Sequence, residues 1–124
     1  MNIIISNSSG KPIYEQITSQ LKHMIMTGEL RAHDALPSMR MLAKELRISV
    51  ITTKRAYEDL EKDGFIYTVV GKGSFVAESN HELIKEEQLK QIEDALGTAI
   101  EKARQAGVSM DELKEMLQML IEEA

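Results

Sequence analysis

The chain has 124 residues, a net charge of −5 and a hydrophobic content of 43%, which suit one compact domain or a small domain with an appendage. It contains no cysteine, which excludes disulfides and thiolate metal sites and fits a reducing compartment. The opening "MNIIISNSSGK" lacks the basic segment of a secretory signal, and no apolar run approaches the roughly 18 residues of a membrane span, so we expect a soluble cytoplasmic protein without a membrane partner.

The acidity is concentrated in the C-terminal part of the chain. Residues 1–77 carry a charge of +2, whereas residues 78–124 carry −7. Within the first part, the window from Arg40 to Arg55 holds five basic residues and a single acid, Glu45. We therefore expect a local basic face on a protein whose total charge would repel polyanions.

Helical periodicity dominates the first 64 residues. Pro12 suits the first turn of a helix over residues 12–27. Ser38 can cap a short second helix, and Ser49 can cap a third helix that ends at Gly64. Two helices joined by a turn of about three residues predict a helix-turn-helix.

The apolar period then changes to that of strands. The runs "FIYTVV" and "SFVAE" are rich in β-branched and aromatic residues and are separated by Gly71-Lys72-Gly73, which predicts a β-hairpin with a glycine-rich tip. The predicted fold is therefore mainly α with a small β-hairpin, in the order of a winged helix-turn-helix. This domain is expected to occupy residues 1–78.

Residues 79–124 predict a separate α-helical hairpin. Its first half has apolar residues at helical spacing, and Ser109 with Glu112 has the spacing of a capping box at the start of a second helix. A pair of helices this short buries little surface alone, so its apolar stripes must pack on the first domain or on a second copy of the chain, and we expect the second copy. The expected domain boundary is Ser79–Asn80. The residues expected in the dimer interface are Leu89, Ile92, Leu96, Ile100, Leu113, Met116, Leu117, Leu120 and Ile121.

The motif Gly71-Lys72-Gly73-Ser74 allows three interpretations. A nucleotide-binding P-loop is disfavoured, because a glycine follows the lysine and a strand, not a helix, comes next. In an arbitrary hairpin, an ordinary turn with a solvated Lys72 would be the better interpretation. Beside a helix-turn-helix, however, the same tip can reach a sugar-phosphate backbone, where Lys72 would position the protein without reading sequence.

The third predicted helix has a polarised charge distribution. Its outer face carries Lys54 and Arg55 near the N-terminus, whereas four acids crowd toward its end. An exposed Lys-Arg pair is often only a solvated face, but a helix that enters a major groove by its first turns would have this polarity. Ser38 and Ser49 can act as caps alone, or as caps that also donate to phosphate.

No enzyme is predicted. The histidines His23, His33 and His81 lack the spacing of metal ligands, and no Ser/His/Asp or paired-carboxylate arrangement can be assembled. We therefore expect no catalytic residue, no metal and no cofactor.

The residues also resemble a known family. The run "LPSMRMLAKELRISVITTKRAYEDLEKDGFIYTVVGKGSFV", from Leu36 to Val76, resembles the signature of the GntR family of bacterial transcriptional regulators, and "KPIYEQI" at Lys11–Ile17 is similar to the opening of its first helix. The resemblance covers nearly all of residues 11–77. The tail resembles that of the YtrA subfamily, in which two C-terminal helices dimerise the protein in place of a large effector-binding domain.

The resemblance implies which residues contact DNA, and this chain departs from the family pattern at some of them. Many members have Arg or Pro at the position of Val50, Asn or Thr at that of Ile51, and Glu at those of Met39 and Met41. Direct readout is therefore expected to depend more on apolar contacts of Val50 or Ile51 with thymine methyl groups. It is also expected to depend on Thr52, Lys54 and Arg55. With Ser38 added as a cap that can donate to phosphate, the predicted DNA-binding residues are Ser38, Arg40, Ser49, Val50, Ile51, Thr52, Lys54, Arg55, Gly71, Lys72 and Gly73.

The predicted function is that of a homodimeric, sequence-specific DNA-binding regulator. The resemblance implies a repressor that binds an inverted-repeat operator in double-stranded DNA and controls a small operon, such as one for an ABC transporter. The alternative is a winged-helix protein-interaction module without DNA binding, which would not require the basic cluster. Whether a small-molecule effector controls the protein is left open.

Overall fold

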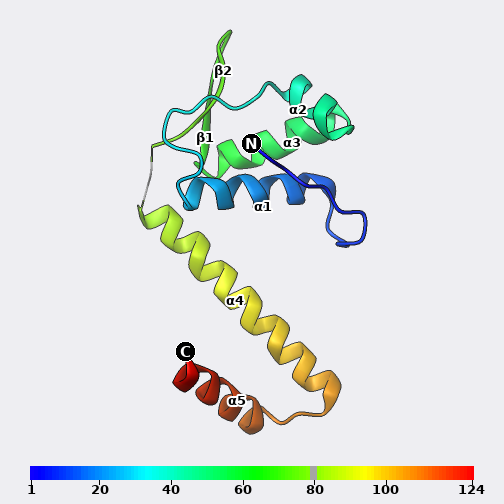
Figure 1. Ribbon diagram of the computed structural model, residues 1–124, viewed down its shortest axis with the longest axis vertical. Coiled ribbons are helices and arrows are strands. Elements are labelled where there is room, and N and C mark those ends of the chain that lie inside the picture. Colours follow the sequence, from blue (N-terminus) through cyan, green and yellow to red (C-terminus); the bar gives the residue numbers. More distant parts are fainter. Residues whose placement is uncertain (79–80) are drawn as a thin grey trace. The chain divides into compact units, whose positions relative to one another are not determined.

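Three helices and a β-hairpin form the first part of the protein, and two further helices form the second (Figure 1). The computed structural model describes residues 1–78 and 81–124. These fall into two compact units, Met1–Asn80 and His81–Ala124; the predicted boundary, Ser79–Asn80, lies outside the described residues. The elements are α1 (Ile13–Met26), α2 (Met39–Leu46), α3 (Val50–Lys62), β1 (Ile66–Val69), β2 (Gly73–Val76), α4 (His81–Ala106) and α5 (Met110–Glu123). The predicted fold class is confirmed.

Serine residues fix the starts of three helices. The hydroxyl oxygens of Ser38, Ser49 and Ser109 each accept a hydrogen bond of 3.1 Å from the backbone N–H three residues later. Each bond satisfies one of the free N–H groups that every helix N-terminus leaves. The predicted caps of α2, α3 and α5 are confirmed.

The turn of the helix-turn-helix depends on an arginine in the left-handed backbone region. Arg47 has φ 57° and ψ 47°, and the N–H of Ile48 donates to the carbonyl of Ala43 at 3.0 Å. Glycine is the usual residue here, because a side chain in this region costs about 1–2 kcal/mol. The pattern of a turn was predicted, but the conformation of Arg47 was not.

The core of the first unit lies where α1 and α2 pack on α3. Its fully buried side chains include Ile17, Leu21, Leu42 and Leu60. Tyr57 of α3 is buried with them and donates a hydrogen bond of 2.8 Å from its hydroxyl to the carbonyl of Pro37, just before α2. This bond fixes α3 against the start of α2. Burial, with a smaller contribution from the charge of Glu45, raises the pKa of Tyr57.

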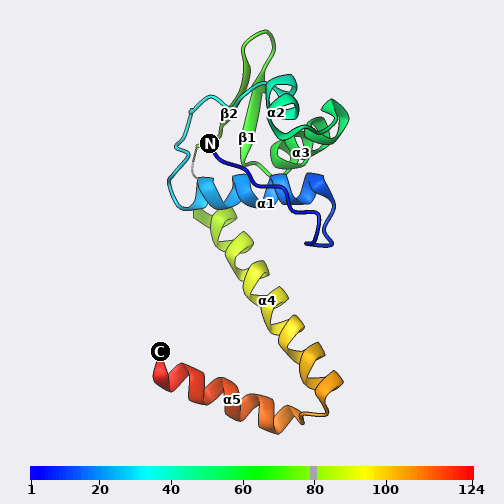
Figure 2. The same ribbon diagram turned by 45° about the vertical axis from the view of Figure 1, so that its right-hand side comes forward.

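The hairpin is antiparallel and has a third, short partner. Its register pairs Ile66 with Val76 and Val69 with Gly73, which confirms the predicted hairpin. Residues 33–36, which precede α2, lie along the other edge of β2: the N–H of His33 donates to Val76 at 2.7 Å, and a bridge joins Ala35 to Phe75. No strand was predicted for these residues. This added segment braces the wing, which projects from the helices in Figure 2.

The second unit is a helical hairpin, as predicted. Gly107, with φ 72°, ends α4, and the N–H of Val108 donates to the carbonyl of Ala103 at 2.8 Å. Ala103 is buried, but no residue of α5, all of which the structure describes, is buried. The unit therefore leaves most of its apolar side chains in contact with solvent. Within the described ranges, no helix has the length and apolar character needed to cross a membrane.

Candidate nucleic-acid interface

The first turn of α3 presents two apolar side chains to solvent. Ile51 is 80% exposed and Val50 is 45% exposed, whereas Thr53 and Ala56 are completely buried. The helical period produces this division, because residues three and four apart share a face. Ile51 is therefore almost free of contacts within this unit and Val50 is about half covered, and such exposed β-branched side chains suit contact with the methyl groups in a major groove.

Two hydroxyl groups at the start of α3 are hydrogen-bonded to each other. Ser49 Oγ and Thr52 Oγ1 lie 2.8 Å apart, and Ser49 Oγ also accepts from the N–H of Thr52. Only one of the two hydroxyl hydrogens is needed for the bond between them. The other remains able to donate to a phosphate, so the cap and a phosphate contact are compatible.

The basic side chains of the helix-turn-helix differ in what holds them. Arg40 on α2 is exposed. Lys54 forms an ion pair of 3.7 Å with Glu58 one turn later, and both side chains are more than half exposed. Such a surface pair is weak, so Lys54 can exchange Glu58 for a phosphate. Arg55 instead lies over the ring of Tyr14, with Cζ 3.7 Å from the ring centre.

The wing tip is a tight turn that exposes a valine and a lysine. The N–H of Lys72 donates to the carbonyl of Val69 at 2.9 Å. Gly71 and Gly73 have φ of 78° and 114°, and no heavy atom lies within 4 Å of where a Cβ would stand at either one. The backbone conformation therefore requires these glycines, while steric space does not. Val70 is 97% exposed and lies two residues from Lys72.

All of the predicted DNA-binding residues lie in the first unit, on α2, on α3 or at the wing tip. Sequence reasoning missed two neighbours of this set, Tyr14 and Val70. Tyr14 was seen only as part of the α1 motif, and a contact between residues 41 positions apart leaves no periodic signal. The exposure of Val70 could have been predicted, because the residue precedes the glycines of the turn.

The second unit has an apolar hollow between its two helices. A cavity of about 370 Å³ is lined by residues that include six from the predicted dimer interface. Ile121 is exposed nearby on α5. The six are Leu96, Ile100, Leu113, Met116, Leu117 and Leu120.

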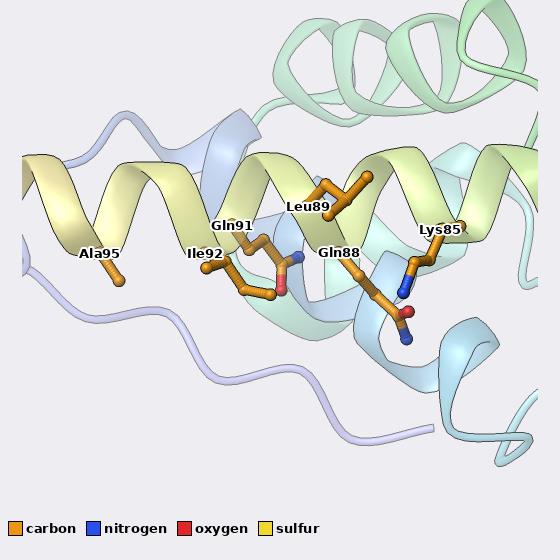
Figure 3. Close-up of a pocket in the computed structure, with 6 residues that line it drawn as sticks. All are labelled: Lys85, Gln88, Leu89, Gln91, Ile92 and Ala95. Atoms are coloured by element: carbon orange, nitrogen blue, oxygen red, sulfur yellow. The ribbon is translucent and has the colours of Figure 1, made fainter. Parts of the chain in front are cut away.

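A second hollow, of about 410 Å³, runs along the N-terminal half of α4. Figure 3 shows its six lining residues, all on α4, from Lys85 to Ala95. They include Leu89 and Ile92, the other two predicted interface residues. A hollow with walls from one helix does not enclose a ligand. Elsewhere among the described residues, no group of three His, Asp or Glu side chains could hold a metal ion.

A helix-turn-helix whose third helix has an exposed basic pair in its N-terminal half, followed by a glycine-tipped hairpin, defines a winged helix-turn-helix regulator. Residues 13–76 match the family model "Bacterial regulatory proteins, gntR family". The chain therefore belongs to the GntR family, whose members here are transcriptional regulators and not enzymes.

Three comparisons place the chain within this family. It is 35% identical to the HTH-type transcriptional repressor YtrA of Bacillus subtilis (strain 168) over 115 residues, which are 93% of this chain and 88% of that protein. The structure of YtrA from Sulfolobus acidocaldarius, a GntR-family transcription factor, is 33% identical, matches with a TM-score of 0.56 and covers 98% of each chain. The resemblance to YtrA is thus confirmed over both units.

The third comparison concerns the first unit only. The DNA-binding domain of AraR, solved in complex with the operator ORX1, is 25% identical and matches with a TM-score of 0.55 over 62% of this chain and 96% of that one.

Proposed function

We propose that this regulator binds double-stranded operator DNA as a homodimer in the cytoplasm and represses a small operon, such as one that encodes a transporter. The observation that carries this proposal is the first turn of α3, where Val50 and Ile51 are exposed beside the hydroxyls of Ser49 and Thr52. The similarity to the repressor YtrA along nearly the whole chain supports repression, and the AraR–operator complex supports DNA as the ligand.

In the proposed complex, α3 enters the major groove by its N-terminal turns. The exposed Ile51 and Val50 contact thymine methyl groups, so the protein favours A·T pairs at those positions. Arg40 and Lys54 contact phosphates on either side, and Lys72 contacts the backbone or the minor groove from the wing. The absence of Cβ atoms at Gly71 and Gly73 allows the wing backbone to approach the DNA closely.

The second unit joins two such domains. Its apolar side chains on α4 and α5 are exposed within one chain, and a two-fold dimer would bury them against the same residues of a second copy. Two copies of α3 would then meet half-sites related by two-fold symmetry, with centres about 34 Å apart or a multiple of that distance.

The proposal is tested by selecting duplexes from a random-sequence library with the full-length protein. Binding to the selected duplex is then measured by fluorescence anisotropy at several salt concentrations, with a shuffled duplex as the control. We expect the selected duplex to bind at least a hundredfold more tightly than the shuffled one, with an affinity that falls steeply with salt. A protein that enriches no sequence and shows no salt-sensitive binding is not a DNA-binding regulator.

A further inference from the structure

Arg55 is held in place by an aromatic ring from another helix. Its Cζ lies 3.7 Å from the centre of the Tyr14 ring, well within the range of a cation–π contact. Among the described residues, no carboxylate lies within ion-pair distance of Arg55, whereas its neighbour Lys54 pairs with Glu58. The ring of Tyr14 is therefore the contact that orients this guanidinium.

The contact lies in the N-terminal half of α3, the half that bears the exposed apolar residues. A second contact between the same two helices, the ion pair of 3.1 Å between Lys22 and Asp63, lies eight residues further along each helix. Eight residues span about 12 Å of helix, and α1 and α3 run in the same direction past each other (Figure 1). Arg55 thus lies one turn after Ile51 and one turn before Glu58, where the acidic residues of α3 begin.

Contact with a ring leaves the donors of a guanidinium available. Its five N–H groups lie in the plane of the group and point outward from its edge, whereas the ring occupies a face. An arginine held by one face can still donate two parallel hydrogen bonds to a phosphate or to the O6 and N7 atoms of guanine. It also loses part of its rotamer freedom before DNA arrives, which reduces the entropy lost on binding.

We propose that Tyr14 is a positioning residue for DNA recognition, which holds Arg55 so that it donates a bidentate pair of hydrogen bonds to the DNA. The inference rests on the proposed function and extends the interface to α1. Tyr14 acts through Arg55 and needs no DNA contact of its own. Its aromatic ring is the essential feature, and its hydroxyl is not.

The test is a double-mutant cycle on the full-length protein, with the duplex selected by the wild-type protein as the probe. The variants are Tyr14→Phe, Tyr14→Leu, Arg55→Ala and the double variant Tyr14→Leu/Arg55→Ala. We expect Tyr14→Phe to bind like the wild type and Tyr14→Leu to bind about two- to fivefold more weakly. Arg55→Ala should bind at least about fivefold more weakly, and adding Tyr14→Leu to it should change nothing further.

The cycle separates positioning from a structural or direct role. If Tyr14→Leu weakens binding equally with and without Arg55, Tyr14 acts independently and the proposal is wrong. A thermal melt of each variant checks the fold. If Tyr14→Leu is unfolded at the assay temperature, the variant Arg55→Lys is measured in its place, because lysine keeps the charge but lacks the planar group. The affinity of Arg55→Lys for the duplex should then fall to that of Arg55→Ala. Binding by Arg55→Lys as tight as the wild type would overturn the proposal.

Two further readouts identify the acceptor on the DNA. A phosphate contact lowers the salt slope of Arg55→Ala by about one, whereas a guanine contact makes wild-type binding sensitive to replacing single guanines by 7-deazaguanine. Either result supports the proposal. If the salt slope and the sensitivity to 7-deazaguanine are both unchanged, the proposal is wrong. Failure of the proposed function is distinct, because the wild-type protein itself would then select no duplex, and both proposals would fall.

Discussion

The guanidinium of Arg55 lies 3.7 Å over the ring of Tyr14 and joins α3 to the first turn of α1. At the other end of the same two helices, Lys22 pairs with Asp63. These two contacts flank a packed apolar seam that includes Ile17, Leu21 and Leu60. The position of α3 is therefore determined by α1 as well as by α2, and the proposed function predicts that substitutions in α1 alter DNA recognition.

Lys72 at the wing tip should contribute a contact that is independent of sequence. Lys72→Ala should weaken binding to selected and shuffled duplexes by a similar factor and lower the salt slope by about one, because one counterion fewer is released. Lys102→Ala, which changes an exposed lysine of α4, is the matched control and should leave the slope unchanged. An unaltered slope in a salt titration of Lys72→Ala would show that the wing does not contact phosphate.

Ser49 should have two separable roles. Ser49→Ala should lower the free energy of unfolding by about 1 kcal/mol, because the N–H of Thr52 loses its acceptor. Ser49→Asp keeps an acceptor at the cap and should retain most of the stability, but its negative charge should weaken DNA binding. Urea unfolding and anisotropy on the same variants check both roles. DNA binding by Ser49→Asp as tight as the wild type would exclude Ser49 from the interface.

Arg47 occupies a backbone conformation that favours glycine. Arg47→Gly should raise the free energy of unfolding by about 0.5–1 kcal/mol, because it removes the strain of a Cβ in the left-handed region at some cost in chain entropy. Arg47→Val, a β-branched residue, should lower it. The melting temperatures of the two variants should therefore shift in opposite directions from that of the wild type. Equal shifts would show that the backbone at Arg47 is not strained.

Tyr57 should make the protein sensitive to alkaline pH. Burial raises its pKa above the ordinary value of 10.0, so above pH 10 the unfolded chain loses this proton while the folded protein keeps it. The contribution of Tyr57 is thus constant below pH 10, and the free energy of unfolding falls by about 1.4 kcal/mol per pH unit above it. Tyr57→Phe should be about 1–2 kcal/mol less stable at pH 7, since Pro37 loses its donor. Tyr57→Phe should also lack the fall in the free energy of unfolding that Tyr57 causes above pH 10. Denaturant unfolding of both proteins from pH 8 to pH 11 measures this difference.

Leu117 should be required for assembly. It lines the apolar cavity between α4 and α5 and is partly exposed, so Leu117→Glu should place a charge in the proposed dimer interface and favour the monomer. Gln105→Glu adds the same charge at an exposed position of α4 outside the cavity lining. Sedimentation velocity should give a dimer for the wild type and for Gln105→Glu. A wild-type monomer at micromolar concentration would contradict the proposed interface.

Local features of the fold could be predicted from the sequence. The caps at Ser38, Ser49 and Ser109 depend on residues three positions apart, and the hairpin depends on two short runs and the glycines between them. Interactions of this kind lie within a window of about ten residues. The order of these elements was then enough to predict the winged helix-turn-helix.

Features that depend on tertiary packing could not be predicted in this way. Residues 33–36 bond to β2, some 40 positions later, although nothing in their own pattern resembles a strand. Arg47 is left-handed at the end of α2, but the usual signal for this conformation is a glycine, and the sequence has none at this position. The pairing of Tyr14 with Arg55 likewise exists only once α1 has packed on α3.

The most direct test of the central claim is a hydroxyl-radical footprint of the wild-type protein on its selected duplex, with Ile51→Ala and Lys72→Ala beside it. The proposed dimer predicts two protected half-sites related by two-fold symmetry, with centres separated by about 34 Å or a multiple of it. Ile51→Ala should lose discrimination at an A·T pair within each half-site, and Lys72→Ala should lose protection at the backbone flanking it. A single protected site, or protection that neither variant changes, would contradict recognition by a dimer through α3 and the wing.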